Sequence, residues 1–289
     1  MNTCCIYCQN NNISYLDDYK FEILEDIDLL GEMKIYECQS CKFVYADPMP
    51  DINKLDLFYK KIYRSFNRPH NYDNFFKKYS YLYDINLEYL SYLTSNIQFE
   101  NIRTILDFGC GLGNLGFALK KKFKHLELHC IENDENCKSV LEKRGYKNYN
   151  NISNIDKKFD LIISLHVFEH LTSLSPVNKL IKLLNKDGYL FYEVPNTDFE
   201  DGYKYRIFDT PHLIFFNEKN ISRVFDDNGM KKISNLKSSY SIKHDIENQL
   251  FSLNNSRNTS FLSKIKKIFK AIEPNYITDF RRKKILSKQ

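Results

Sequence analysis

The chain has 289 residues, of which 43% are hydrophobic, and it carries a formal net charge of +5. This length is enough for one large α/β domain with a small appendage and a substantial core. The sequence has no run of about 18 apolar residues, which a membrane-spanning helix needs. Its first residues also lack the basic and apolar segments of a secretory signal. We therefore expect a cytoplasmic protein without a transmembrane segment.

Four of the eight cysteines form two CxxC pairs within the first 50 residues. The pairs are Cys5 with Cys8 and Cys38 with Cys41, and 29 residues with short strand-like runs lie between them. Cytosolic cysteines are usually reduced, and two such pairs offer the four thiolates of a tetrahedral zinc site. The spacing predicts a zinc ribbon over residues 1–50 with a closed, structural metal site. Cys4 remains an alternative to Cys5 as a ligand.

The predicted ribbon is acidic. Residues 1–50 contain three lysines and nine acidic residues, a net charge of −6. Zinc ribbons often bind nucleic acid, but this charge would repel phosphates. The composition therefore argues against nucleic acid as the partner of this segment.

Residues 51–100 predict a helical segment rich in aromatic side chains. It follows the proline-containing turn Asp47–Asp51, which ends the ribbon. Twelve Phe or Tyr residues lie between Phe58 and Tyr92. Aromatic side chains are usually buried, so a core-facing stripe is the simpler interpretation. The alternative is an aromatic lid in which Tyr72 contacts a ligand.

From Ile102 onward, apolar strand-like runs alternate with helical patterns. This alternation predicts an α/β fold of the Rossmann-like, doubly wound kind, with a parallel sheet and helices on both faces. Ligands of such sheets bind beyond the carboxyl ends of the strands. The segments after Phe108, Ile131, Leu165 and Val194 should therefore meet at one rim.

The first of these segments is glycine-rich and is typical of a nucleotide-binding loop. Gly111, Gly113 and Gly116 satisfy the dinucleotide pattern GxGxxG, which is weak on its own. Asp107 precedes the loop at the end of its strand, where it could orient the loop or meet an ammonium group. Glu132 ends the next strand, where a carboxylate can accept hydrogen bonds from ribose hydroxyls. A fold that binds a dinucleotide needs no charged residue at the position of Asp107, so this residue favours a different nucleotide cofactor.

Four segments resemble the successive motifs of class I S-adenosylmethionine-dependent methyltransferases: LDFGCGLGN, CIEND, FDLIISLHVFEHL and GYLFYEVPN. The resemblance covers residues 100–230. The ribbon with its ending IYECQSCKFVYADPMP further resembles a bacterial subset that has an N-terminal zinc-binding module and often acts on sugars or surface polysaccharides. The resemblance implies that Asp107, Gly109, Gly111 and Gly113 bracket the methionine end of the cofactor, Glu132 its ribose, and Leu165 with His166 the rim beside the sulfonium.

The residues His166, Glu169 and His170 also spell HxxEH, the inverted zinc-protease motif. That motif needs a long helix, whereas here it directly follows a buried strand, so a protease is rejected. Some catechol-type O-methyltransferases bind a divalent ion through an acid and a Glu-His pair, but His166 stands in place of the acid. We therefore expect Glu169 and His170 to anchor the start of a helix and shape the rim.

His212 is the candidate catalytic base. It follows the strand GYLFYEVPN and so returns to the functional rim, and histidine is the usual proton acceptor near neutral pH. The alternative is that its ring holds the loop by hydrogen bonds to the backbone. Just upstream, Tyr205 and Arg206, with Tyr203, are candidates to bind substrate hydroxyls or a phosphate.

The last segment, residues 246–289, reads as a basic tail. Phe261, Ile265, Ile268 and Ile272 recur at helical spacing among lysines, and Pro274 ends the pattern. This amphipathic helix is expected to pack on the domain, with contact to a membrane surface as the alternative. The run Arg281–Lys284 is expected to be a mobile end.

The sequence thus predicts four parts: a zinc ribbon (1–50), a helical aromatic lid (51–100), a domain that binds S-adenosylmethionine (101–245) and a basic tail (246–289). The resemblance implies a methyltransferase with structural zinc whose acceptor is a nucleotide-linked sugar or another phosphorylated precursor of a surface polysaccharide, methylated on oxygen or carbon. An RNA methyltransferase, a non-catalytic scaffold with the same fold and an NAD-dependent oxidoreductase are the alternatives.

Overall fold

A computed structural model of the chain describes residues 4–19, 30–62, 80–198, 211–235 and 276–283. Tyr72, Tyr203, Tyr205, Arg206 and the amphipathic helix predicted at 261–272 lie outside these described residues. No helix within the described ranges is long and apolar enough to cross a membrane.

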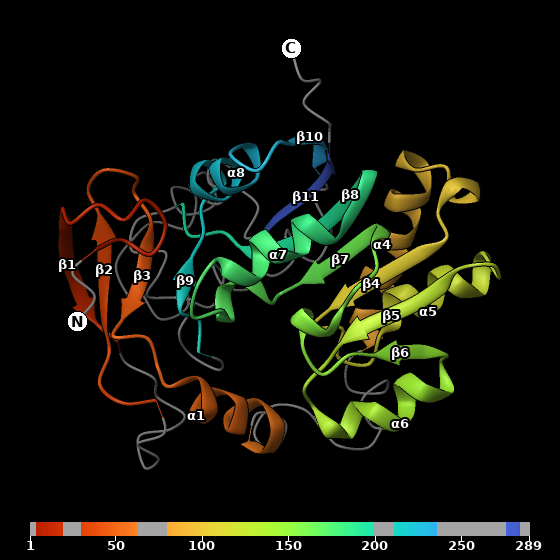
Figure 1. Cartoon of the computed structure of the whole chain (residues 1–289), viewed down its shortest axis with the longest axis horizontal. Coiled ribbons are helices and arrows are strands. Elements are labelled where there is room, and N and C mark those ends of the chain that lie inside the picture. Colours follow the sequence, from red (N-terminus) through yellow and green to blue (C-terminus); the bar gives the residue numbers. More distant parts are fainter. Residues whose placement is uncertain (1–3, 20–29, 63–79, 199–210, 236–275, 284–289) are drawn as a thin grey trace, which may run out of the picture.

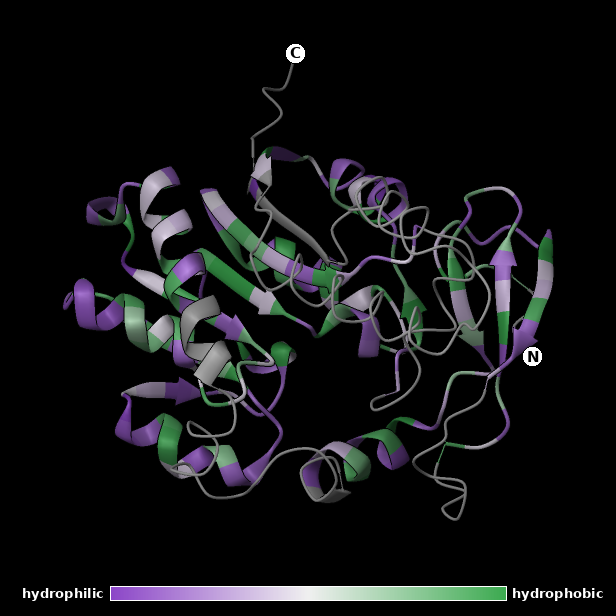
Figure 2. Ribbon diagram, turned by 180° about the vertical axis from the view of Figure 1, so that it is seen from behind, coloured by the Kyte–Doolittle hydropathy of each residue, from purple (hydrophilic) through white to green (hydrophobic). Residues whose placement is uncertain are grey.

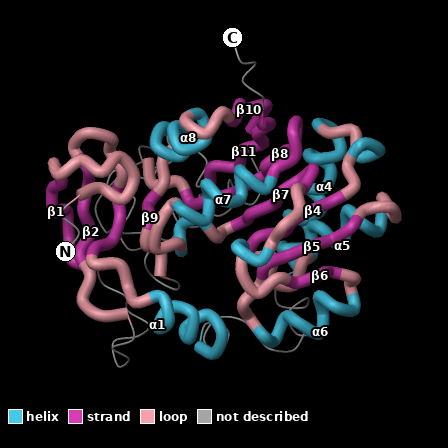
Figure 3. The backbone as a smooth tube through the Cα atoms, in the orientation of Figure 1, coloured by secondary structure: helices cyan, strands magenta, loops and turns pink. Residues whose placement is uncertain are grey.

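A seven-stranded sheet forms the centre of the molecule, in the order β10-β11-β8-β7-β4-β5-β6 (Figures 1 and 3). Five neighbouring strands are parallel: β4 (Thr104–Phe108), β5 (Glu127–Ile131), β6 (Tyr146–Asn148), β7 (Phe159–Leu165) and β8 (Leu184–Pro195). At one edge, β11 (Tyr276–Lys283) pairs antiparallel with β8, and β10 (Met230–Asn235) pairs antiparallel with β11. The predicted Rossmann-like parallel sheet is confirmed.

Helices cover both faces of this sheet because successive side chains of a strand point to opposite faces. On β4, Ile105 belongs to one core cluster with residues of α4 (Ser80–Asn96), α5 (Asn114–Lys122) and α6 (Glu135–Lys143). The next residue, Leu106, belongs to the core on the other face with residues of α7 (Ser175–Leu183) and α8 (Glu218–Asp226). In Figure 2 the central strands are largely hydrophobic, whereas the surface helices carry hydrophilic residues.

Short helices complete the described chain. An α-helix, α1 (Ile52–Leu57), continues into a π-helical turn, η2 (Phe58–Ile62). Single 3-10 turns occur at η3 (Phe99–Asn101), η4 (Ile152–Asn154) and η5 (Phe168–His170). The last of these carries the Glu-His pair, so the HxxEH motif lies on a strand end and a 3-10 turn instead of a long helix.

A second, antiparallel sheet contains the N-terminal strands β1 (Ile13–Asp18), β2 (Lys34–Cys38) and β3 (Val44–Asp47). Its fourth strand is β9 (Ile214–Phe215), which comes from the segment directly after His212. The hydroxyl of Tyr7 also donates a hydrogen bond to the carboxylate of Asp227 at the end of α8. The N-terminal module is therefore continuous with the segment that carries the candidate base, while the four-part division of the chain stays a prediction.

The expectation of a mobile end at Arg281–Lys284 is wrong for the residues that β11 contains. Arg281 is buried, and its guanidinium donates hydrogen bonds to Asp226 Oδ1 at 2.8 Å and to Ser222 Oγ at 2.9 Å, both on α8. It also lies over the ring of Phe225, with 5.1 Å between Cζ and the ring centroid. The partners on α8 are distant in the sequence, so the charge run alone gave no sign of a buried strand.

Candidate functional site

The loop from β4 to α5 has the backbone geometry that glycine permits. Gly109, Gly111 and Gly113 have φ angles of 69°, 54° and 66°, in the left-handed region that other residues rarely adopt. A Cβ atom on Gly109 would lie 2.4 Å from Val167 Cγ2, and one on Gly113 would lie 2.7 Å from the ring of Tyr146. The loop therefore has no room for side chains at these two positions.

Glu132, at the end of β5, lies against this loop. Its Oε2 accepts a hydrogen bond from the backbone N–H of Gly111 at 2.6 Å, and its Oε1 accepts one from the N–H of Asp134 at 2.9 Å. Its own N–H donates to the side-chain oxygen of Asn148 on β6 at 3.1 Å. These contacts fix the carboxylate at the carboxyl ends of neighbouring parallel strands, as the sequence pattern predicts.

Asp107 is a buried carboxyl beneath the same loop. Burial raises its pKa, the charge of Glu132 raises it further and Tyr146 opposes the rise, which leaves the pKa at about 7. A nearby cation would therefore stabilise its ionised form. Next to it, α5 begins after Gly113, which has no side chain to cap the helix, and a helix N-terminus favours an anion. An ammonium and a carboxylate on one ligand, as in the methionine part of S-adenosylmethionine, fit this pair of features.

The turn after β7 contains a residue under backbone constraint. His166 follows Leu165 with a φ of 57°, and its N–H donates to the carbonyl of Glu193 at 2.9 Å. Its Nε2 lies 2.9 Å from Oε1 of Glu193, and the hydroxyl of Tyr89 donates to the same oxygen at 2.6 Å. Tyr89 lies on α4 and Glu193 on β8, so three elements meet at this carboxylate.

The electrostatics of this turn favour the protonated form of His166. Loss of hydration lowers the pKa of His166, but the neighbouring carboxylates of Glu169 and Glu193 outweigh that effect and raise the pKa to about 9. Its side chain is 40% exposed at the rim. A histidine that is already protonated at neutral pH can donate a hydrogen bond but cannot accept a proton from a substrate.

Sequence reasoning missed Glu193 and Tyr89. The signal available for Glu193 was a single acid inside the otherwise apolar run of GYLFYEVPN. Tyr89 gave no signal of its own among the many aromatic residues of its segment.

His212 lies beside the Phe168–His170 turn. The rings of His170 and His212 are edge to face, with centroids 4.7 Å apart. The N–H of Leu213 donates to the carbonyl of Glu169 at 2.7 Å, and the hydroxyl of Tyr19 donates to the carbonyl of His212 at 3.0 Å. The structure therefore brings the candidate base together with the HxxEH residues, from two distant segments of the chain.

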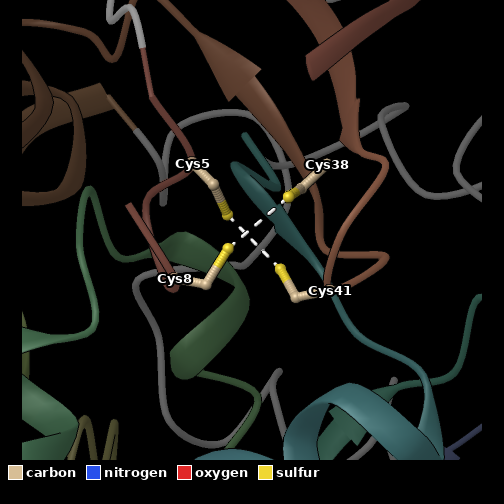
Figure 4. A group of neighbouring side chains, drawn as sticks. All are labelled: Cys5, Cys8, Cys38 and Cys41. Atoms are coloured by element: carbon tan, nitrogen blue, oxygen red, sulfur yellow. Dashed lines mark hydrogen bonds between the residues drawn. The ribbon is translucent and has the colours of Figure 1, made fainter. Parts of the chain in front are cut away.

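The four predicted zinc ligands form one cluster (Figure 4). Their sulfur atoms all lie within 4.8 Å of one another, with Cys5 and Cys41 at 3.5 Å and Cys8 and Cys38 at 3.6 Å. Four thiolates at about 2.3 Å from a tetrahedral zinc ion are separated by about 3.8 Å, so this cluster fits the ion.

The two CxxC turns have the same backbone form. Each is followed by a residue in the left-handed region, Gln9 with a φ of 58° and Lys42 with a φ of 61°. Each of these residues donates its N–H to the carbonyl of the first cysteine of its turn, at 3.1 and 2.8 Å. The thiol of Cys4 contacts Gln9 instead, so Cys5 and not Cys4 completes the cluster.

Comparison with known proteins identifies the family. Residues 75–235, more than half of the chain, match the family described as a methyltransferase domain. The chain belongs to this family. The class I S-adenosylmethionine-dependent methyltransferase domain expected from the sequence motifs is thereby confirmed.

Individual relatives of this methyltransferase domain are distant. (S)-Coclaurine N-methyltransferase of Thalictrum flavum subsp. glaucum is 28% identical over 109 residues, which span 33% of this chain and 30% of that protein. An uncharacterized protein of Methanocaldococcus jannaschii is 26% identical over 131 residues, 45% of this chain and 58% of that protein. The matches thus span less than two thirds of the length of either relative.

A solved structure shares the fold of this methyltransferase domain. The plantazolicin methyltransferase BpumL in complex with SAH matches with a TM-score of 0.51 at 14% identity, over 80% of this chain and 94% of that chain. The similarity supports the fold assignment.

Proposed function

We propose that this protein transfers a methyl group from S-adenosylmethionine to a small molecule. The observation that carries the proposal is the joint position of the glycine loop, the buried Asp107 and Glu132 at the carboxyl ends of β4 and β5 in a chain of the methyltransferase-domain family. Together these residues can bind the ammonium, the carboxylate and the ribose of that cofactor.

Each cofactor-binding residue has a task in this proposal. Asp107 meets the ammonium group, and the N–H groups at the start of α5 meet the carboxylate. Gly109, Gly111 and Gly113 let the backbone approach the cofactor. Glu132 accepts hydrogen bonds from the ribose, and Leu165 and His166 form the rim beside the sulfonium.

The cofactor supplies a methyl group bound to a positively charged sulfur atom. The protein aligns the acceptor so that the new bond to the methyl carbon forms as the carbon–sulfur bond breaks and its electron pair stays on sulfur. His212 accepts the proton that the acceptor loses. His166, with its raised pKa, holds a proton already and is not the acceptor of that proton.

We further propose that the acceptor is a nucleotide-linked sugar or another phosphorylated precursor of a surface polysaccharide. The resemblance of the N-terminal segment to the sugar-modifying subset supports this choice, together with the Cys5, Cys8, Cys38 and Cys41 cluster that it requires. Zinc in that cluster is structural and stabilises the N-terminal sheet, in which β3 pairs with β9. Tyr72, Tyr205 and Arg206 are the proposed contacts to the acceptor.

The test uses purified protein, methyl-labelled S-adenosylmethionine and an extract of cells that lack the gene. The extract is afterwards separated into small molecules, RNA and protein. Label in small molecules that a phosphatase alters would support the proposal. A Glu132→Ala variant should lose the labelling, and Glu127→Ala, at the other end of the same strand, is its control.

The other outcomes separate the alternatives. Label in RNA would show an RNA methyltransferase. Absence of label together with absence of cofactor binding would show a scaffold, and binding of NAD in its place would show an oxidoreductase.

A further inference from the structure

Glu169 is a buried carboxylate that accepts no hydrogen bond from the residues that the structure describes. It is 2% exposed, and in the described part of the chain no hydrogen bond reaches either of its side-chain oxygens. Two imidazole nitrogens lie close to Oε1, His166 Nδ1 at 3.7 Å and His170 Nε2 at 3.8 Å. His166, whose pKa Glu169 helps to raise, compensates part of this charge, but at 3.7 Å its Nδ1 makes no hydrogen bond to the carboxylate. Burial of a carboxylate stays costly unless donors or a further cation complete the compensation.

The hydrogen bond at the other side of His170 decides which of its nitrogens carries the proton. Nδ1 lies 3.1 Å from the carbonyl oxygen of Pro211. Because a carbonyl only accepts, Nδ1 must donate, and in the neutral ring Nε2 then carries a lone pair. That lone pair is on the atom that faces Glu169. A backbone carbonyl that orients the far nitrogen in this way is typical of histidines that bind metals.

His212 supplies a third group of the same kind. One ligand atom each of Glu169, His170 and His212 lies within 4.8 Å of the other two. Two ligands bound at about 2.1 Å to one cation are separated by about 3 to 4 Å, so small shifts would bring all three onto it. The bonds from Leu213 to Glu169 and from Tyr19 to His212 already hold the two segments together.

We propose that Glu169, His170 and His212 bind a divalent metal ion, at a site separate from the four-cysteine cluster. Two imidazoles and one carboxylate suit first-row ions such as Zn²⁺ or Mn²⁺. Three protein ligands leave a coordination position open, which is the arrangement of a catalytic and not of a structural site.

One consequence for the reaction rests on the proposed function. A metal ion at this site would hold an oxygen of the acceptor and lower the pKa of its hydroxyl group. His212 would then act as a metal ligand and no longer as the base. Binding of the metal itself does not depend on this consequence.

The test titrates Mn²⁺ into the full-length protein, with zinc retained on the cysteines, and measures the free ion by electron paramagnetic resonance. Mn²⁺ is a suitable probe because it prefers carboxylate and imidazole groups to thiolates. We expect one Mn²⁺ per chain. Glu169→Gln and His170→Gln should each weaken binding by at least about tenfold.

Two matched controls are available. Glu127→Gln removes an exposed acid on β5, and His125→Gln removes a histidine whose Nε2 contacts only the backbone carbonyls of Phe99 and Ile102 among the described hydrogen bonds. Both should bind Mn²⁺ as the wild type does. Circular dichroism of every variant checks that it is folded.

The proposal is overturned if the wild-type protein binds no Mn²⁺ at millimolar concentration, a result that needs no variant. It is equally overturned if folded Glu169→Gln and His170→Gln both keep the wild-type affinity. Failure of the proposed function is recognised separately, by the absence of methyl transfer and of cofactor binding.

Discussion

The Nε2 atom of His166 lies 2.9 Å from Oε1 of Glu193, a carboxylate with no exposed surface. The same oxygen accepts the hydrogen bond of Tyr89 at 2.6 Å. One buried charge therefore joins the rim of the sheet to β8 and to α4, the helix that precedes β4 in the chain.

Removal of the Tyr89 hydroxyl should destabilise the protein. Tyr89→Phe takes one donor from a buried carboxylate, and hydrogen bonds to charged groups contribute about 1.5 to 3 kcal/mol. We expect a loss of that size in the free energy of unfolding, measured by urea denaturation. Tyr36→Phe is the control, because no hydrogen bond of its hydroxyl is found in the described part of the chain, and it should change stability by less than about 0.5 kcal/mol. Equal effects of the two variants would contradict the role of Glu193 as a junction.

The affinity for S-adenosylmethionine should rise with pH over the range in which Asp107 ionises. The pKa of Asp107 in the folded protein is about 7, above its usual value of 3.8. Protonated Asp107 therefore stabilises the fold without ligand, fully below pH 3.8, and this stabilisation is lost as the pH rises to about 7. A cofactor ammonium stabilises the ionised form, so binding releases a proton in this window. Calorimetry between about pH 5 and about pH 7 should show up to a tenfold gain in affinity per pH unit.

Asp107→Asn is the control for this dependence. The variant should bind the cofactor more weakly and with a smaller dependence on pH over the same range. A pH dependence identical to that of the wild type would exclude Asp107 as its source.

Alanine at Gly113 should cost far more stability than alanine at Gly229. Both glycines have a left-handed backbone, with φ of 66° and 71°, so both substitutions carry a strain of about 1 to 2 kcal/mol. Only the Cβ at position 113 would meet a buried ring, that of Tyr146 at 2.7 Å, while none of the described atoms lies within 4 Å of a Cβ at position 229. Urea denaturation should show the difference as a further loss of about 1 to 3 kcal/mol for Gly113→Ala. Similar losses would mean that the loop moves aside without cost.

The parts of this fold that the sequence predicts are those specified by local patterns. Glycines at 109, 111 and 113 permit a left-handed backbone that other residues rarely adopt, and the CxxC pairs need only two tight turns. Apolar strand runs that alternate with helices likewise indicate a parallel sheet.

The parts that the sequence did not predict depend on partners far apart in the chain. Arg281 is buried because Asp226 and Ser222 receive its guanidinium, and nothing in RRKK indicates those partners. The two-residue strand β9 exists because β3 lies beside it. In the same way, His170 and His212 meet because Pro211 and Leu213 bond to the turn that contains Glu169 and His170.

Zinc content should distinguish Cys4 from Cys5. Cys5→Ser removes one of four clustered thiols, and we expect loss of the metal and of the stability that it gives to the N-terminal sheet. Cys4→Ser changes a thiol that contacts only Gln9 among the described hydrogen bonds, so its zinc content should stay at one ion per chain. Elemental analysis of the purified variants measures both. Retention of zinc in Cys5→Ser with loss in Cys4→Ser would reverse the assignment.

His212→Ala should abolish turnover while the affinity for S-adenosylmethionine stays within about twofold, because the ring packs against His170, which is not among the proposed contacts to the cofactor. Both roles considered for His212, proton acceptor and metal ligand, lead to this loss.

The two roles differ in how the turnover of the wild-type enzyme responds to Mn²⁺. If His212 is the base, removal of free divalent ions leaves turnover unchanged. If it is a ligand, turnover falls and added Mn²⁺ restores it. Unchanged turnover in His212→Ala, with the Tyr36→Phe variant assayed beside it, would exclude both tasks.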